Sequence, residues 1–166
     1  MHNVFVDIMY LSDFDIKREM KNGNIEITPF TEDHLTPNGY DLSILIEKPV
    51  YKSEPISDVF LKYDKYTLKP GDGVRIKSIE TIHLGNGFIG FMYLRSRYSR
   101  NGIYGSFAVI DSGFNGVIMA YIKNESDKPV EILPKDGVIH LVIAKLESKS
   151  EHPYGSTEKS HFQNQK

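Results

Sequence analysis

One carboxylate in the sequence is placed where a group that acts on a ligand would be. Asp111 directly follows the apolar run 108–110, and an aromatic residue, Phe114, comes three positions later among small, turn-forming residues. A tight turn requires neither a charge nor a ring at these positions. A ligand site can use both, because the carboxylate can act on a water molecule and the ring can pack on the bound molecule. These residue types predict a site at this bend.

A second group of residues suited to chemistry is a run of hydrogen-bond donors. The stretch from Arg95 to Arg100 directly follows the apolar run 88–94 and contains three Arg and two Ser in six residues. Guanidinium forks and hydroxyls match the geometry of phosphate oxygens. The composition fits equally well a solvated edge or a salt-bridge network between subunits, so both interpretations stay open.

Two more polar residues lie within apolar segments. Asp41 is the one acid in the stretch 40–46, and His140 lies in the apolar run 138–144. On pattern alone, Asp41 is an outward-facing residue of an amphipathic strand. A single His among aliphatic residues is more often a hydrogen-bonded core group than a ligand, and we expect that of His140.

The elements that must position these residues are mostly strands. Residues 107–121 are expected to form two strands joined by a tight loop, because turn-forming residues separate two runs rich in β-formers. Other strands are expected at 24–28, 40–46, 74–79, 81–84, 88–94, 130–133 and 138–144. One short helix is expected near the N-terminus, with Ser12 as its N-cap and Gly23 just past its end. The pattern predicts a mostly β barrel or jelly roll.

Length and composition restrict the class of protein. The 166 residues are enough for one domain with a hydrophobic core, and the net charge of -2 with no basic run predicts no nucleic-acid partner. A few local cations would still suffice for a triphosphate. The absence of cysteine excludes a disulfide framework and fits a reducing cytoplasm. No apolar run is long enough to span a bilayer, and the first residues lack the features of a signal peptide, so no membrane partner is expected.

The last residues differ from the rest in composition. The chain is polar from Glu147 on, and only Tyr154 and Phe162 could anchor this segment to the core. We expect a single domain over residues 1–148 and a flexible C-terminal arm over residues 149–166, which could act as a lid or reach a neighbouring subunit.

Several segments, taken in order, resemble the dUTPase / dCTP deaminase superfamily, nearest its archaeal dCTP deaminase-like branch. The segment 39–42, Gly-Tyr-Asp-Leu, is similar to the first motif of the superfamily, and Arg95-Ser stands where an Arg-Ser-Ser motif begins. Residues 108–116 are close to the third motif, and residues 127–130 with 138–142 resemble the fourth. Each match is weak alone, but their order and spacing are specific.

The resemblance implies a fold, an assembly and roles for the bend. The fold would be the distorted β barrel or jelly roll of the dUTPase-like (β-clip) type, assembling as a homotrimer with sites between subunits. Asp111 would orient and activate a water. Main-chain groups of the hairpin, including Gly116, would bind the pyrimidine edge, and Phe114 would pack on the deoxyribose and exclude a 2′-hydroxyl.

The resemblance also assigns the phosphates and the metal. Arg95 and Ser96 would hold phosphate oxygens, with Arg100 beside them. The C-terminal arm, residues 149–166 and called the tail below, would close over the triphosphate through Tyr154, Lys159 and Gln165. Asp41 would lie near Mg²⁺ or its water shell. Arg97, at the second Ser of the motif, could add a phosphate contact or block the base.

One position separates the two activities of the superfamily. Deaminases carry a proton-shuttling Glu in the strand after the hairpin, and here that position is Tyr121, whose ordinary pKa of ~10 makes it a poor substitute. Glu125 lies beyond the strand. His140 stands where Gln is usual, and the tail lacks the Gly-rich phosphate-wrapping motif of ordinary dUTPases.

We therefore predict a dUTP diphosphatase that converts dUTP and water to dUMP and pyrophosphate. Mg²⁺ would arrive largely on the triphosphate, since it keeps most of its waters and takes few carboxylates. One alternative is a dCTP deaminase, alone or as a bifunctional dCTP deaminase/dUTPase. Another is a nucleotide-binding trimer that has no catalytic activity.

Overall fold

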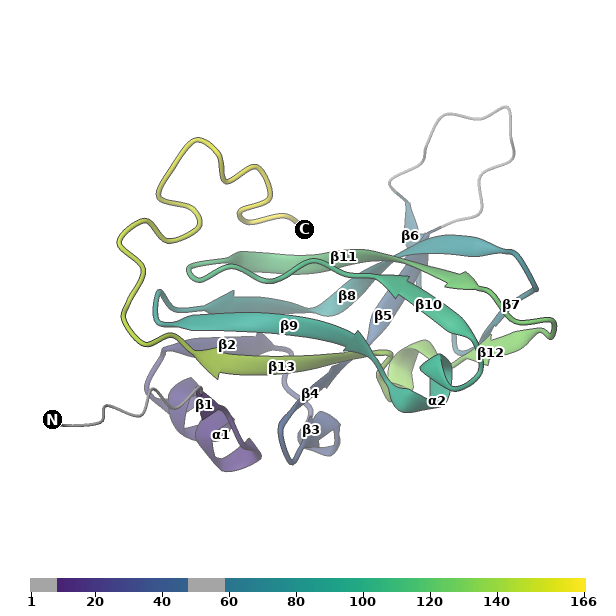
Figure 1. Cartoon of the computed structure of the whole chain (residues 1–166), viewed down its shortest axis with the longest axis horizontal. Coiled ribbons are helices and arrows are strands. Elements are labelled where there is room, and N and C mark those ends of the chain that lie inside the picture. Colours follow the sequence, from purple (N-terminus) through teal and green to yellow (C-terminus); the bar gives the residue numbers. More distant parts are fainter. Residues whose placement is uncertain (1–8, 48–58) are drawn as a thin grey trace, which may run out of the picture.

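The computed structural model describes residues 9–47 and 59–166, and two curled β-sheets enclose its core (Figure 1). The first sheet contains β1 (Met9–Tyr10), β13 (Ile139–Lys145), β4 (Gly39–Leu42) and β3 (Leu35–Thr36), with β9 (Phe88–Leu94) also paired to β13. The second contains β10 (Ile103–Ser106), β11 (Asn115–Asn124), β8 (Gly73–Leu84), β5 (Ile44–Glu47) and β6 (Phe60–Leu61), with β2 (Ile25–Thr28) also paired to β8. A small third sheet pairs β12 (Val130–Ile132) with β7 (Tyr66–Leu68).

Helical structure is short. The elements are α1 (Asp13–Lys21), α2 (Ser96–Ser99) and the 3₁₀ turns η1 (Glu32–His34) and η2 (Pro134–Asp136). The predicted mostly β fold with a short N-terminal helix is confirmed. Ser12 caps α1 in a capping box with Asp15, and its hydrogen bonds lower the pKa of the Asp15 carboxyl. Ile16 anchors the helix to the core.

The longest strand is a correction to the sequence prediction. The two strands expected at 74–79 and 81–84 are one strand, β8, in which every second residue is buried. The pattern looked interrupted because two of the inward residues, Ser78 and Glu80, are polar. Both are paired: Ser78 Oγ accepts from the Ile118 N–H at 2.8 Å, and the Glu80 carboxylate accepts from the Ser43 N–H at 3.0 Å.

The chain crosses between the sheets at two places that the sequence prediction missed. The single strand expected at 40–46 is interrupted at Ser43, so that β4 lies in the first sheet and β5 in the second. The first strand of the expected hairpin, residues 107–110, is also absent. β11 pairs instead with β10 and β8, and residues 107–114 form a loop that touches β9 through one bridge, Ile110 with Gly90. The loop therefore places Asp111 where the two sheets meet.

The C-terminal segment after β13 contains no helix or strand. It runs as the yellow coil in Figure 1 from the end of β13 up to β11. In the described ranges, 9–47 and 59–166, no helix has both the length and the apolar character needed to cross a membrane.

Candidate active site

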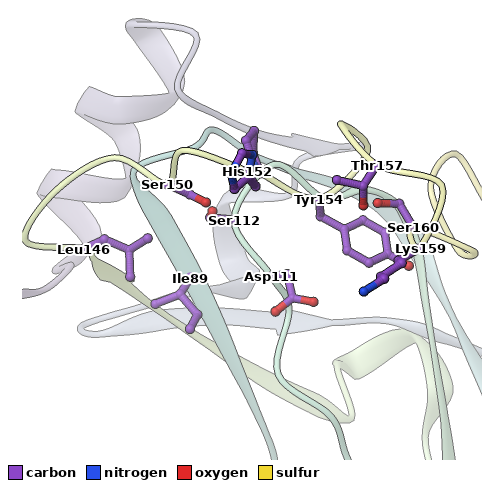
Figure 2. A pocket seen from close by; sticks show the side chains of 11 residues that line it. Ile89, Asp111, Ser112, Leu146, Ser150, His152, Tyr154, Thr157, Lys159 and Ser160 are labelled. Atoms are coloured by element: carbon purple, nitrogen blue, oxygen red, sulfur yellow. The ribbon is translucent and has the colours of Figure 1, made fainter.

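Two cavities of about 440 Å³ each share Asp111, Tyr154 and Lys159 in their walls. The walls of the first mix polar and apolar groups and come mostly from the tail, with hydroxyls and an imidazole from Ser150, His152, Thr157 and Ser160. Figure 2 shows the Asp111 carboxylate pointing into this space, with Tyr154 and Lys159 on one side of it. The second cavity is largely apolar, with walls from Phe114, Ile118, Met119 and Phe162. A ligand with an apolar and an anionic end would suit the pair.

Asp111 is held by its backbone while its side chain stays unpaired. Its carbonyl accepts from the Phe114 N–H at 3.2 Å, and the loop is tied to β8 by Gly113 N to Leu84 O at 2.8 Å and by Leu84 N to Phe114 O at 3.0 Å. Among the residues that the structure describes, none binds the Asp111 carboxylate. A fixed, exposed carboxylate of this kind can take a proton from a water bound in either cavity.

Phe114 forms an apolar wall beside that carboxylate. Its side chain is buried, and its ring lies 5.8 Å from the Tyr154 ring, centroid to centroid, at a tilt of 51°. The tail aromatic thus extends the wall that begins in the loop.

The tail is hydrogen-bonded along the loop and the start of β11. Tyr154 N donates to Ser112 O at 2.7 Å, and Asn115 N donates to Gln163 Oε1 at 3.0 Å. Gln165 makes two bonds to one peptide: its carbonyl accepts from Val117 N at 3.1 Å, and its Nε2 donates to Val117 O at 2.6 Å. The main-chain groups of this edge are therefore oriented to pair with amide-like partners.

Two glycines make the close approach of the tail possible. A Cβ added at Gly113, where φ is +86°, would lie 2.6 Å from Pro153 Cβ and 2.7 Å from Tyr154 O. A Cβ added at Gly116 would lie 3.1 Å from Gln165 N. The structure thus brings together six of the predicted site residues: Asp111, Phe114, Gly116, Tyr154, Lys159 and Gln165.

The predicted arginine cluster lies elsewhere in the chain. Arg95 precedes α2, Ser96 begins it, and Arg97 and Arg100 lie exposed on and just after it. None of the four lines either cavity. The register of β9 shows the separation: Gly90 meets Ile110 beside Asp111, whereas Arg95 follows the far end of β9.

Asp41 is buried, and both of its carboxylate oxygens are paired, so the outward-facing position expected from the pattern is wrong. It is 5% exposed, because β4 is covered on both faces. Arg95 Nε forms an ion pair with Asp41 Oδ2 at 2.9 Å, and His140 Nδ1 donates to Asp41 Oδ1 at 2.8 Å. His140 is hydrogen-bonded as expected, but its side chain is 20% exposed, so it lies at the edge of the core and not within it.

The side chains around Asp41 do not form a metal cage. In the part of the chain that the structure describes, no group of three or more His, Cys, Asp or Glu residues is arranged to hold a metal ion. Each Asp41 oxygen already has a protein partner, Arg95 in an ion pair and His140 in a hydrogen bond. A carboxylate paired in this way suits a guanidinium better than Mg²⁺. The role of Asp41 in a metal's water shell stays a prediction.

The position where deaminases carry their Glu is exposed and lies outside the walls of both cavities. Tyr121 is paired in register with Ser106 of β10 and Arg75 of β8, and it lines neither cavity. Glu125 is exposed, and its carboxylate pairs with Lys123 Nζ at 2.8 Å, which raises the pKa of that lysine. Within one chain, neither residue lies beside Asp111.

Several residues of the site were not singled out from the sequence. Ser78 fixes Ile118 from the neighbouring strand, and the tail hydroxyls Ser150, Thr157 and Ser160 line the first cavity. The polar composition of the tail was a general signal for them, but no spacing identified these positions.

Comparisons with known proteins place most of the chain in one group. Residues 10–146 match a family model described as dCTP deaminase-like. A dCTP deaminase of Pyrococcus horikoshii is 34% identical over 146 residues, which cover 88% of this chain and 88% of the relative. A protein of Sulfolobus islandicus rod-shaped virus 1, named a probable deoxyuridine 5'-triphosphate nucleotidohydrolase, is 32% identical over 146 residues, covering 88% of this chain and 90% of the relative.

Solved structures show the same fold. A dCTP deaminase from Agrobacterium tumefaciens has a TM-score of 0.63 at 16% identity, and the match covers 83% of this chain but only 48% of that one. A dUTPase from the Staphylococcus aureus phage phi11, described with a structural Mg(II) ion, has a TM-score of 0.52 at 17% identity over 81% of this chain and 98% of its own. The predicted dUTPase-like type of fold is thereby confirmed.

Proposed function

The chain belongs to the dCTP deaminase-like family, and within it we propose that the protein is a dUTP diphosphatase, which hydrolyses dUTP to dUMP and pyrophosphate. The observation that carries the proposal is Asp111: an exposed carboxylate in a braced loop, unpaired within the described residues, between a largely apolar cavity and one that offers hydroxyls, an imidazole and an ammonium group. A pyrimidine deoxynucleotide has the matching shape, with an apolar sugar and base at one end and a triphosphate at the other.

The chemistry of pyrophosphate release suits these residues. The reaction needs a water in line with the α-phosphorus, a carboxylate that orients it and takes its proton, and cations that spread the developing charge. Asp111 would be the base, and Lys159 would supply a positive charge from the tail. Phe114 would pack on the deoxyribose, and the main-chain groups of Val117 would bind the base in place of Gln165, which pairs with them in this structure. Mg²⁺ would enter as part of the substrate, bound to the triphosphate.

A homotrimer would complete the site. Lys159 is the one Lys or Arg in the walls of the two cavities, whereas Arg95, Arg97 and Arg100 lie around α2. A triphosphate is a poor match for a single cation, so the arginine cluster of a neighbouring subunit would supply the missing charge. The superfamily resemblance supports this arrangement.

The second candidate function is dCTP deamination, favoured by the names of relatives such as the Pyrococcus horikoshii protein. Deamination needs a group that moves protons at the base. Tyr121 holds the position of that Glu, and Glu125 is paired with Lys123 at 2.8 Å outside both cavities. These observations support hydrolysis over deamination.

The test is a pair of product assays with the full chain. The protein is incubated with Mg²⁺ and either dUTP or dCTP, and pyrophosphate and ammonia are measured separately, with D111N as the matched control. We expect pyrophosphate from dUTP, none above background with D111N, and no ammonia from dCTP. Ammonia that depends on the protein would favour the deaminase, and binding without either product would favour a non-catalytic trimer.

A further inference from the structure

We propose that Asp41 and His140 are positioning residues for Arg95, fixing its guanidinium so that it can bind an anionic oxygen of the nucleotide. The inference rests on the proposed function only in taking a pyrimidine deoxynucleotide as the ligand. It gives Asp41 a role other than the water shell of Mg²⁺, and it gives a role to His140, which stands where the superfamily usually has Gln.

The three side chains come from three elements and meet at one carboxylate. Asp41 lies on β4, His140 lies opposite it on β13, and Arg95 stands between β9 and α2. Asp41 Oδ2 forms an ion pair with Arg95 Nε at 2.9 Å, and Asp41 Oδ1 accepts from His140 Nδ1 at 2.8 Å. Both oxygens are therefore paired, and the buried carboxylate cannot rotate without breaking the ion pair and the hydrogen bond.

Arg95 is bound on its inner edge and open on its outer edge. Besides the Asp41 contact, its Nη1 donates to the carbonyl of Asp136, and its main-chain N donates to Val138 O at 3.1 Å. Its side chain is 35% exposed, and nothing among the described residues accepts from its Nη2. A guanidinium held in this way presents a fixed fork, which is the geometry that binds a phosphate oxygen pair.

The backbone around the cluster leaves no spare room. A Cβ added at Gly137 would lie 2.7 Å from Asp41 Cβ, and one added at Gly39 would lie 3.0 Å from the His140 ring. The cluster is thus packed tightly enough that Asp41 and His140 have one arrangement, and Arg95 inherits its orientation from them.

The electrostatics favour this role for Asp41 over metal binding. A carboxylate that already faces a guanidinium at 2.9 Å attracts a second cation less, because the two positive charges repel. Mg²⁺ on a triphosphate can keep its waters and needs few protein carboxylates. A role through Arg95 explains the burial of Asp41, its pairing and the presence of His140 together.

The experiment separates nucleotide binding from metal use. The affinity of the full chain for dUTP and for dCTP is measured by calorimetry in a chelator, and the Mg²⁺ concentration for half-maximal hydrolysis is measured separately. The variants are R95A, D41N, the double variant D41N/R95A, H140L and H140Q. R18A, which removes an arginine paired with Asp15 on α1, is the matched control.

We expect R95A and D41N each to weaken metal-free binding about tenfold, the scale of one charge-assisted hydrogen bond. The double variant binds no more weakly than R95A, because Asp41 acts through Arg95. H140L loses about threefold, and H140Q, which can still donate to Asp41, recovers most of that loss. Effects on hydrolysis appear in KM more than in kcat, and the Mg²⁺ requirement does not change.

Three results would overturn the inference. The first is that D41N binds dUTP normally without metal but needs a higher Mg²⁺ concentration for hydrolysis. The second is that the losses of affinity from D41N and R95A add up in the double variant. The third is that H140L and H140Q both bind the nucleotide as tightly as the wild type does. If D41N does not fold, the His140 pair decides, since the His140 side chain is already 20% exposed. A wild type that binds but does not turn over dUTP would end the proposed function and leave these comparisons intact, whereas one that binds neither nucleotide would end both.

Discussion

Asp111 and Asp41 carry the same carboxylate, but the fold surrounds them in opposite ways. Asp111 is exposed at a loop between two cavities, and the described residues leave its oxygens unpaired. Asp41 is buried, with one oxygen bound by Arg95 and the other by His140. An unpaired carboxylate is free to bind and deprotonate water, whereas a fully paired one holds other groups in place. The difference between the two sites lies in whether protein groups pair with the carboxylate.

The backbone around each residue explains this difference. Asp111 lies in a loop that is fixed through main-chain bonds from Gly113 and Phe114, so its side chain is not needed for structure. Asp41 lies within β4, between β3 and β13, where a charge left unpaired would be costly. A group intended for chemistry can be left unpaired only where water or a ligand reaches it.

The strongest way to break the comparison is to neutralise each carboxylate in turn. D111N should lower kcat for dUTP hydrolysis by roughly 10²–10⁴-fold, the usual contribution of a general base, with dUTP binding nearly unchanged. D41N should act mainly on KM. The measurements are pyrophosphate release under saturating dUTP and calorimetric binding. Losses of equal size in kcat from both variants would show that the two residues do not differ in the way described.

Removing the tail should affect only the Asp111 side of the comparison. A chain ending at residue 148 lacks Tyr154, Lys159 and Gln165, and we expect KM for dUTP to rise at least about tenfold, because a charged contact of a few kcal/mol is lost. The melting temperature should change little, since the tail adds no strand. A KM equal to that of the full chain would mean that the tail does not contact the nucleotide.

A third carboxylate, Glu80, is also buried, and we expect its substitution to have the smallest effect of the three. It is 2% exposed, and its bonds come from the Ser43 N–H, with His34 Nδ1 3.9 Å away. Burial raises the pKa of Glu80 above its ordinary value of 4.5. The folded state therefore favours the protonated form: this stabilisation is complete below the unfolded pKa and is lost as the pH rises through the folded pKa.

E80Q should therefore be more stable than the wild type at pH 7.5, by roughly 1 kcal/mol, because the amide keeps an acceptor for Ser43 without the charge. The gain should vanish near pH 4, where the wild-type carboxyl is protonated. Urea unfolding at both pH values is the measurement. A variant that is less stable than the wild type at pH 7.5 would show that the ionised form is the one that the fold requires.

The sequence identified the Asp111 site better than the Asp41 cluster, for a physical reason. Asp111 and Phe114 are neighbours in one loop, so local composition was enough to predict them. The two partners of Asp41 come from other elements: they are Arg95 and His140. His140 lies 99 positions after Asp41 in the chain. Strand periodicity carries no information about contacts of that range, and it suggested an outward side chain.

The strand errors have a similar cause. β8 looked like two strands because Ser78 and Glu80 occupy inward positions where the pattern expects apolar residues, and their bonds to Ile118 and Ser43 form only in the folded sheet. Residues 107–110 looked like a strand because they are apolar, but β11 already has neighbours in β10 and β8. Pairing partners are chosen by the whole sheet, which a local pattern does not contain.

The backbone of Gly113 is in the left-handed region, and this limits which substitutions the loop and the tail can accept. Because glycine has no Cβ, Pro153 and Tyr154 can occupy the space where a side chain would begin. An alanine at this position would strain the loop itself, because φ is +86°, and would also collide with Pro153 and Tyr154 of the tail. Loop and tail therefore share one steric constraint, and a lineage that alters one of them has to alter the other.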